Sequence, residues 1–501
     1  MSFIGDLHNS FSTNKNRCAF CFDGQDISYG EFLEYINGTV ELLNKYLPEI
    51  NQPVGIISHG GCIETYAAIF ATWFSGNYFV PINPQHPGER NMSIIKNVGI
   101  QHVLSAKESL LEVIGNHEKL NIIINSGIKS ENDKEPVNVT NKQRLYVLTT
   151  SGSTGVPKHV PINMENLESY CNAFLNRFPE LQSDACFLQI YDLTVDASFT
   201  SYVIPLMVGA CVYTLPEGQF KFLAIAKLLA DKNVNWVKLT PSVLSFLNSY
   251  RLKLDFKHLK HIIIGGEALP EVLLKEWHPV FPKTRIANHY GPTEATVGAT
   301  AYRIDDIQNI RSLNGIVSIG KPFSEVECVV VNENGNEVEP EEKGELCIGG
   351  KQVMEGYLNG NDSSFILLGQ DNRKNKFYRT GDIVQKDKDG YIYYLGRTDD
   401  QVKIEGHRIN LIEIENKVRD LLSGYQIIMV AHQKITGLKR LYLFIEGTGV
   451  DIMKLKSRLA EQLPPKMIPE DIFLVPKIPL TVGGKIDRIK LANDYLMNLS
   501  G

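Results

Sequence analysis

The chain has 501 residues, of which 43% are hydrophobic and 22% charged, and its formal net charge is -6. This composition excludes a disordered or fibrous chain, and the length predicts at least two domains because one hydrophobic core rarely holds so many residues. The acidic balance gives no electrostatic reason to bind a polyanion, so we expect no nucleic-acid partner.

The first residues carry no targeting signal. They lack a basic segment followed by an apolar one, and no uncharged apolar run reaches membrane-spanning length. We therefore expect a cytoplasmic protein without a membrane partner.

Eight cysteines are spread irregularly along the chain, which predicts reduced thiols rather than a disulfide framework. Cys18 and Cys21 have the spacing of a zinc-binding pair. A structural zinc site needs about four ligands, and no second pair of this kind follows, so the favoured interpretation is a strand rather than a metal or redox site.

Short apolar runs alternate with amphipathic stretches through the first three quarters of the chain. Residues 29–47 have helical periodicity, and strand-like runs occur at 121–124, 145–148, 236–239 and 261–264, most of them followed by Gly, Ser or Pro and then a helical pattern. This alternation predicts a parallel sheet with covering helices. Residues 129–141 are polar and aperiodic, which indicates a surface connection.

After Tyr378 the pattern changes to short charged strands with Gly turns, and a new amphipathic helix begins at Leu411. The sequence therefore predicts an α/β protein. Its large N-terminal domain, residues 1–398, interleaves sheets and helices, and its smaller, mobile α+β C-terminal domain covers residues 399–501.

A glycine- and hydroxyl-rich segment, residues 148–158 (LTTSGSTGVPK), follows a strand pattern. Glycines let backbone N–H groups approach phosphate oxygens, Ser and Thr add donors, and Lys158 adds positive charge. The spacing differs from the Walker pattern GxxxxGK[ST], so the usual P-loop fold is disfavoured. Taken alone, the segment could also be a surface loop.

This loop resembles the third core motif of the adenylate-forming superfamily, which contains acyl-CoA synthetases, luciferases and the adenylation domains of nonribosomal peptide synthetases. The resemblance continues in order along nearly the whole chain, and two of the matching segments, 27–32 and 73–83, imply mainly structural roles. Departures occur at His159, where Gly usually follows the loop lysine, and at Glu405, where a basic residue is common. The matching segments are residues 27–32 (ISYGEF), 73–83 (WFSGNYFVPIN), 148–158, 191–199 (YDLTVDASF), 288–294 (NHYGPTE), 344–350 (GELCIGG), 378–382 (YRTGD), 396–406 (GRTDDQVKIEG), 463–469 (LPPKMIP) and 479–485 (PLTVGGK).

The resemblance implies ATP and Mg²⁺ as cofactors. It implies that Lys485 reaches the substrate carboxylate and the α-phosphate, and that Glu294 helps bind Mg²⁺. For the nucleoside, it implies that Tyr290 packs on adenine with Asn288 nearby, and that Asp382 accepts hydrogen bonds from the ribose. Forming an acyl-adenylate brings two anions together, which explains the need for positive charge. The expected catalytic residues are Lys485, Lys158, Thr154 and Glu294. The expected ATP contacts are Thr150, Ser151, Gly152, Ser153, Thr154, Gly155, Lys158, Gly266, Glu267, Ala268, Asn288, His289, Tyr290, Gly291, Thr293, Asp382, Arg397 and Lys485.

Simpler roles remain open for several of these residues. Glu294 beside Thr293 could cap a helix, and Lys485 could be an exposed turn lysine. The resemblance also implies a hinge at Asp399, about which the terminal domain rotates between adenylation and thioester formation, and a thiol channel along residues 403–406 with Gly406 permitting close passage.

The substrate pocket implied by the resemblance points to an amino acid, because Asp192 matches the aspartate that pairs with the α-ammonium group, although it could also start a helix. Lys238 lies in an apolar run, so a partner anion is implied. Lys238 and His289 together resemble aspartate-activating domains, and Asp196 disturbs this pattern because it could itself neutralise Lys238. The pocket positions are Asp192, Leu193, Asp196, Lys238, Ile263, Gly265, His289, Val297, Gly298 and Lys485.

This pattern leaves the substrate and the acceptor open. L-Aspartate is the favoured substrate, followed by asparagine or another small polar amino acid. D-Alanine ligases are similar in 290–296, but usually carry a cysteine at the position of Gly265. Because no phosphopantetheine-attachment motif follows Lys485, the carrier protein is expected to act in trans, although a piece of a longer synthetase would look the same. An acid:CoA ligase and a noncatalytic nucleotide-binding homologue also stay open.

Overall fold

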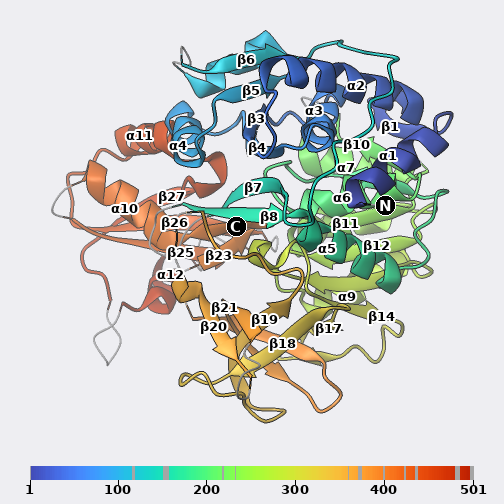
Figure 1. Cartoon of the computed structure of the whole chain (residues 1–501). Coiled ribbons are helices and arrows are strands. Elements are labelled where there is room, and N and C mark those ends of the chain that lie inside the picture. Colours follow the sequence, from blue (N-terminus) through green and yellow to red (C-terminus); the bar gives the residue numbers. More distant parts are fainter. Residues whose placement is uncertain are drawn as a thin grey trace.

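The structure is a computed structural model that describes residues 2–115, 119–150, 157–216, 219–231, 233–358, 360, 362–369, 375–398, 401–422, 425–434, 438–479 and 486–496. Its fold is mixed α/β, with a large sheet-rich part and a smaller C-terminal part (Figure 1). The predicted fold class is confirmed.

A six-stranded sheet forms from the first half of the chain. Its order is β6-β5-β3-β4-β7-β8, in which only the pairing of β7 with β8 is antiparallel. The predicted strands at 121–124 and 145–148 are confirmed as β6 and β7. The strands are β3 (Pro53–Ile57), β4 (Tyr78–Ile82), β5 (His102–Ser105), β6 (Asn121–Ile124), β7 (Arg144–Thr150) and β8 (Lys158–Asn163).

A nine-stranded sheet carries the other half of the large part, in the order β17-β14-β13-β12-β11-β9-β10-β1-β2. Its six central strands run parallel, so their carboxyl ends meet at one edge, where ligands of such sheets usually bind. The strands are β1 (Cys18–Phe22), β2 (Gln25–Ser28), β9 (Cys186–Gln189), β10 (Cys211–Thr214), β11 (Trp236–Leu239), β12 (His261–Gly265), β13 (Arg285–Tyr290), β14 (Thr300–Ile304) and β17 (Lys321–Pro322).

Helices between the two sheets form the main core. Helix α3 (Ile63–Phe74) packs on β3 and β4, while helix α6 (Ala197–Met207) packs on β9, β10 and β11. The third helix is buried on nearly every side, as expected for a helix enclosed by other elements. A capping box of Ser28 and Glu31 starts the second helix. The helices that contribute to this core are α1 (Phe3–Thr13), α2 (Tyr29–Tyr46), α3 (Ile63–Phe74), α5 (Met164–Arg177) and α6 (Ala197–Met207), whereas α4 (Gly88–Val98) packs in a smaller separate core.

Three further helices pack in series beside β11 and β12 and form a second core with them. They are α7 (Lys221–Asp231), α8 (Pro241–Leu247) and α9 (Glu271–Trp277). The short 3₁₀ turns are η1 (Glu108–Ile114), η2 (Asn248–Lys253), η3 (His278–Val280), η4 (Thr293–Ala295), η5 (Asp362–Ser364) and η6 (Pro465–Met467). Residues 129–141 contain no helix or strand, as predicted for a surface connection.

An antiparallel sheet of five strands follows, at the bottom of Figure 1. The longest of these strands, β21, carries the segment with Asp382 and turns it toward β13. The strands are β18 (Val326–Val331), β19 (Lys343–Gly350), β20 (Phe365–Leu368), β21 (Asn375–Lys386) and β22 (Ile392–Arg397), and a separate small ribbon pairs β15 (Ser312–Leu313) with β16 (Ile316–Val317).

The C-terminal part has its own α+β core. It opens with a hairpin whose two turn residues, Glu405 and Gly406, both have positive φ, of 49° and 84°, as a two-residue type I′ turn requires. The boundary at 398/399 stays a prediction, and Asp399 lies outside the described residues. The elements are β23 (Gln401–Ile404), β24 (His407–Asn410), α10 (Leu411–Leu421), β25 (Gln426–Gln433), β26 (Lys439–Glu446), α11 (Ile452–Gln462), β27 (Asp471–Val475) and α12 (Arg488–Leu496).

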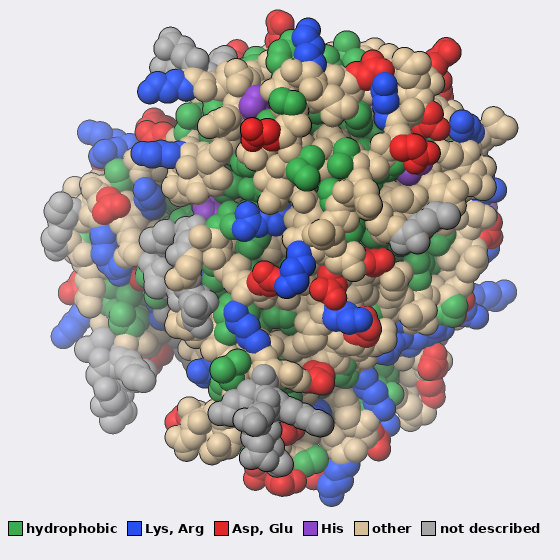
Figure 2. All heavy atoms as spheres, in the orientation of Figure 1, with side chains coloured by type: hydrophobic (Ala, Val, Ile, Leu, Met, Phe, Trp, Pro, Cys, Tyr) green, Lys and Arg blue, Asp and Glu red, His purple; other side chains and the backbone are tan. Residues whose placement is uncertain are grey.

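Charged side chains of both signs are interspersed over the face drawn in Figure 2. Within the described ranges, no helix combines the length and apolarity needed to cross a membrane.

Candidate active site

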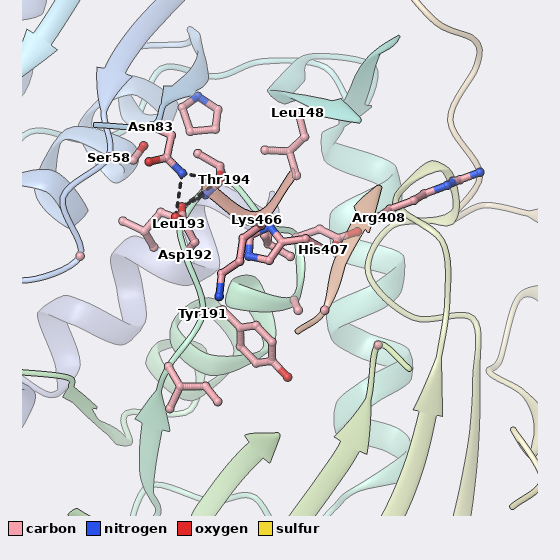
Figure 3. Close-up of a pocket in the computed structure, with 18 of the residues that line it drawn as sticks. Ser58, Asn83, Leu148, Tyr191, Asp192, Leu193, Thr194, His407, Arg408 and Lys466 are labelled. Carbon is pink, nitrogen blue, oxygen red and sulfur yellow. Dashed lines mark hydrogen bonds between the residues drawn. The ribbon is translucent and has the colours of Figure 1, made fainter. Parts of the chain in front are cut away.

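A cavity of about 590 Å³ lies where the carboxyl ends of the parallel strands meet the C-terminal hairpin. The large part contributes the segment after β9, which includes Asp192, and the loop after β13. The small part contributes His407 and Arg408 from β24, together with Lys466 (Figure 3). The predicted residues that line the cavity are Thr150, Asp192, Leu193, Asp196, Lys238, Gly266, His289, Gly291, Thr293, Val297, Asp382, Arg397 and Gly406.

Asp192 is held in place by three hydrogen bonds. The Asn83 amide donates to Oδ2 over 2.8 Å, and the backbone N–H and hydroxyl of Thr194 donate to Oδ1 over 2.9 and 2.8 Å (Figure 3). Because every donor is neutral, the carboxylate keeps its charge available for a cationic group in the cavity. Asn83 ends the segment 73–83, whose role was expected to be mainly structural, and its contact with Asp192 was missed.

Deeper in the cavity lie three ionisable groups, Asp196, Lys238 and His289, which are at most 9% exposed. Burial lowers the pKa of Lys238 to about 7, with Asp196 opposing this shift, and burial raises the pKa of Asp196. Burial also lowers the pKa of His289, with the Lys238 charge adding to the effect, so this imidazole is neutral.

These three side chains have unused hydrogen-bonding capacity. Lys238 donates to the Thr200 hydroxyl over 3.0 Å, whereas Asp196 Oδ2 and His289 Nε2 have no hydrogen-bond partner in the described protein. Buried polar atoms without partners are costly, so the geometry favours a polar ligand group that completes them. If Asp196 is ionised, the ligand group would accept a hydrogen bond from Lys238 and donate one to Asp196. If Asp196 is protonated, the ligand group would accept hydrogen bonds from both residues.

Two glycines shape this pocket by leaving room for His289. A Cβ on Gly298 would lie 1.9 Å from His289 Nε2, and a Cβ on Gly265 would lie 2.3 Å from the His289 carbonyl oxygen. Both distances are too short for any larger residue without movement of the neighbour. Ile263 is buried in the strand beside them.

The loop between Tyr290 and Gly298 is strained. Thr296 and Val297 have φ values of 53° and 67°, a conformation that is rare for a β-branched residue. Buried Gln352 holds the loop, because its side-chain amide donates to the Gly298 carbonyl over 2.6 Å and its backbone carbonyl accepts from the Thr296 hydroxyl over 2.6 Å. No pattern in the sequence predicted this role of Gln352.

The groups expected to bind the nucleoside lie together beside this loop. Tyr290 donates from its hydroxyl to Asp382 over 2.5 Å, and Arg397 forms an ion pair with the same carboxylate. Lys403 from the hairpin places its Nζ 5.5 Å from the centre of the Tyr290 ring. Asn288 donates to the Ser318 carbonyl over 2.9 Å, so its amide also braces the backbone.

Glu294 is 1% exposed and takes its charge partner from the C-terminal hairpin. Arg408 Nη1 lies 3.2 and 3.1 Å from its two carboxylate oxygens, and the Tyr357 hydroxyl donates over 2.8 Å. Burial opposes ionisation of both groups, yet their attraction lowers the pKa of Glu294 and raises that of Arg408. A carboxylate is a suitable ligand for a hard cation such as Mg²⁺, which would need Arg408 to leave this position.

Lys158 begins β8, opposite Thr150 in the β7–β8 pairing, so the predicted phosphate loop joins two antiparallel strands. Its Nζ lies 4.7 Å from the centre of the Tyr357 ring and 3.5 Å from the Ser364 hydroxyl. The neighbouring His159 is buried and contacts the Thr149 hydroxyl over 3.0 Å. Ser151, Gly152, Ser153, Thr154, Gly155 and Lys485 lie outside the described residues, and their roles stay predictions.

The tip of the hairpin docks on the segment after β12. The Gly406 N–H donates to Glu267 over 3.2 Å, and Glu267 also accepts from the Ser242 N–H over 3.1 Å. A Cβ on Gly406 would lie 3.2 Å from the Thr240 side chain, so the close approach favours glycine. Ala268, next to Glu267, is exposed.

Glu405, the departure from the family pattern, is balanced at this tip by two basic residues. Arg440 Nη1 lies 2.9 Å from one carboxylate oxygen, and Lys466 forms an ion pair with the other. The unusual acid therefore has cationic partners within the same C-terminal part.

The cavity lies at the carboxyl ends of a parallel sheet and is covered by a hairpin from a small C-terminal part. An anchored carboxylate on one side and the expected nucleoside-binding groups on the other match the arrangement expected of an adenylating enzyme. The family model described as AMP-binding enzyme matches residues 7–358. The chain belongs to this AMP-binding enzyme family.

Among its relatives is the zwittermicin A synthase ZmaJ of Bacillus cereus, which is 32% identical over 95% of this chain and 91% of its own length. Gramicidin S synthase 2 of Brevibacillus brevis is 29% identical over 96% of this chain, which spans only 11% of that protein. A solved structure, the artificially fused adenylation–PCP di-domain NpsA-ThdA from Klebsiella oxytoca, is 26% identical with a TM-score of 0.81, covering 94% of each chain.

Proposed function

We propose that this protein uses ATP to convert an amino acid into its aminoacyl-adenylate and then passes the aminoacyl group to the phosphopantetheine thiol of a separate carrier protein. The observation that carries the proposal is the fixed Asp192 carboxylate, which faces the cavity beside a polar side-chain pocket. A carboxylate held by neutral donors suits an α-ammonium group, and a fatty acid has no such group to offer.

Different residues of the chain then bind the amino acid, the nucleotide and the metal ion. Asp192 anchors the α-ammonium group, which orients the substrate carboxylate toward the nucleotide side of the cavity, where it attacks the α-phosphate. Tyr290 and Asp382 receive the nucleoside, and Lys158 with the preceding loop holds the departing phosphates. Lys485 neutralises charge at the reacting atoms. Glu294 would hold Mg²⁺, which supplies positive charge beside phosphate oxygens when bound.

The side-chain pocket supports L-aspartate as the first candidate. Charged Lys238 would pair with the substrate carboxylate, and neutral His289 could donate through Nε2. This requires a protonated Asp196, and burial shifts the pKa of Asp196 in that direction. With Asp196 ionised, asparagine fits better, because its carbonyl accepts from Lys238 while its amide N–H donates to the unpartnered Oδ2.

The pocket argues against D-alanine. A methyl side chain would leave the polar atoms of Lys238, Asp196 and His289 unsatisfied. The cysteine usual in such ligases cannot replace Gly265 in this arrangement, because its Cβ would lie 2.3 Å from a carbonyl oxygen.

We further propose that the conformer in this structure is the one used for thiol transfer. Arg408 covers the Glu294 carboxylate and Lys403 covers the Tyr290 ring, so the hairpin occupies positions that Mg²⁺ and adenine need during adenylation. Gly406 at the tip then lines the thiol channel. The PCP domain fused to NpsA supports a carrier protein as the acceptor.

The test is exchange of labelled pyrophosphate into ATP, screened over both enantiomers of each amino acid. We expect exchange only when an amino acid is present, strongest with L-aspartate or L-asparagine. Absence of exchange with every amino acid would favour a noncatalytic homologue. In a second step, efficient transfer to free CoA but not to a holo-carrier would favour an acid:CoA ligase.

A further inference from the structure

Three cysteines that are far apart in the sequence meet at one edge of the nine-stranded sheet, outside the active site. Cys18, Cys186 and Cys211 are the first residues of β1, β9 and β10. Because β10 lies between the other two strands and all three run parallel, their amino ends gather the three thiols at the same edge. Their carboxyl ends point toward the other edge of the sheet, where the active site lies.

The thiols are in contact. Cys18 Sγ lies 3.1 Å from Cys211 Sγ, and Cys211 is also the register partner of Cys186 on the neighbouring strand. Cys21, which has zinc-ligand spacing from Cys18, is instead buried and interacts with Asp26. Within the described ranges, no group of three His, Cys, Asp or Glu residues is arranged to hold a metal ion, so the cluster favours thiol chemistry over metal binding.

The surroundings fix the three strands, while the three cysteine residues are partly exposed. Arg17 donates from Nε to the Gly209 carbonyl over 3.1 Å and also binds the Ser183 carbonyl, which ties together the segments leading into the three strands. All three cysteines are only half-buried. Hydrogen bonding from Cys211 lowers the pKa of Cys186, and contact with Cys18 and Cys186 raises the pKa of Cys211.

We propose that Cys18 and Cys211 are an oxidation site that a peroxide converts into a disulfide bond. The Cys18 sulfur attacks one peroxide oxygen, so that an S–O bond forms, the O–O bond breaks and hydroxide leaves as water with the thiol proton. The Cys211 sulfur then attacks the Cys18 sulfur, forming the S–S bond as the S–O bond breaks and a second water leaves with the Cys211 thiol proton. Two thiols are oxidised and one peroxide is reduced to two waters.

The geometry selects this pair among the eight cysteines of the chain. A sulfur–sulfur separation of 3.1 Å needs a shift of only about 1 Å to reach bonding distance. The bond would join positions 193 residues apart, so it would restrict the unfolded chain strongly. This inference does not depend on the proposed adenylating function.

The experiment treats the full chain with hydrogen peroxide, blocks remaining thiols with iodoacetamide and maps peptides by mass spectrometry without reduction. We expect one linked peptide pair containing Cys18 and Cys211, lighter by two hydrogen atoms than the separate peptides and restored by dithiothreitol. The linked pair should vanish in Cys18→Ser and remain in the matched controls Cys21→Ser and Cys186→Ser. The oxidised wild type should also melt at a higher temperature than oxidised Cys18→Ser.

The wild-type map alone decides the matter, so it does not depend on whether a variant folds. Recovery of Cys18 and Cys211 as alkylated thiols after peroxide treatment would overturn the proposal. So would conversion of either cysteine only to sulfinic or sulfonic acid, or a disulfide from either cysteine to a different partner.

Discussion

The charge of Asp196 should decide whether the pocket prefers aspartate or asparagine. Asp196 faces the same cavity as Lys238, and each shifts the pKa of the other through its charge. The substitution Asp196→Asn keeps the shape of the side chain and removes its ability to ionise. The pocket then changes from a balanced pair to one with the single positive charge of Lys238, which should favour a substrate carboxylate over an amide.

The magnitude follows from the burial of the groups. For charges about 5 Å apart at an effective dielectric constant of about 20, the repulsion removed is roughly 3 kcal/mol. This corresponds to a change on the order of 100-fold in the ratio of kcat/KM for aspartate to kcat/KM for asparagine. The change is smaller if Asp196 is already protonated in the wild type, because only the ionised fraction repels the substrate.

The assay is amino-acid-dependent pyrophosphate exchange with both substrates, measured for the wild type, Asp196→Asn and the exposed control Asp305→Asn. We expect the ratio to rise toward aspartate in Asp196→Asn and to stay at the wild-type value in the control. A ratio that moves toward asparagine would refute the reasoning, because it would mean that Asp196 assists the substrate carboxylate. Equal loss with both substrates would indicate damage to the fold and is checked by thermal unfolding.

Three further predictions concern the same site. Raising the pH from about 6 to about 8 should shift wild-type preference away from aspartate, because Lys238 loses its charge above its pKa of about 7. A preference that rises with pH in the exchange assay would contradict this assignment. Arg408→Met leaves Glu294 buried without its cation, which costs roughly 3–5 kcal/mol in the hairpin-docked conformer. Thioester formation with pantetheine should therefore fall while pyrophosphate exchange persists, and the control Arg408→Lys should lose less thioester formation. Unchanged thioester formation in Arg408→Met would count against a role for the docked hairpin. Gly298→Ala places a Cβ 1.9 Å from His289 Nε2, and such overpacking costs roughly 1–3 kcal/mol. The KM for the amino acid should therefore rise, while ATP binding measured by calorimetry stays close to the wild-type value. An unaltered KM would show that the side chains around Gly298 move without cost.

Local patterns in the sequence predicted many of the elements well. The runs at 236–239 and 121–124 coincide with β11 and β6, because mostly apolar runs of this length are typical of strands and leave a clear signal. The amphipathic stretch at 29–47 matches α2 within one residue at its end. The burial of Lys238 also followed from its apolar neighbours.

Contacts between distant segments could not be predicted in this way. Asn83 reaches Asp192 across 109 positions, and Arg408 reaches Glu294 across 114, and neither pairing leaves a local pattern. Gln352 braces the strained loop from a distant segment of the chain. The sequence spacing pairs Cys18 with Cys21, whereas sheet topology brings Cys18 to Cys211.

Direct detection of the intermediate tests the central claim. The protein is incubated with ATP, Mg²⁺ and L-aspartate or L-asparagine, quenched with acid and examined by mass spectrometry. We expect the corresponding aminoacyl-AMP, formed together with pyrophosphate, and none with the α-deaminated analogue succinate in place of aspartate. Formation of ADP without an aminoacyl-adenylate, or an adenylate formed equally well from succinate, would contradict amino-acid adenylation at Asp192.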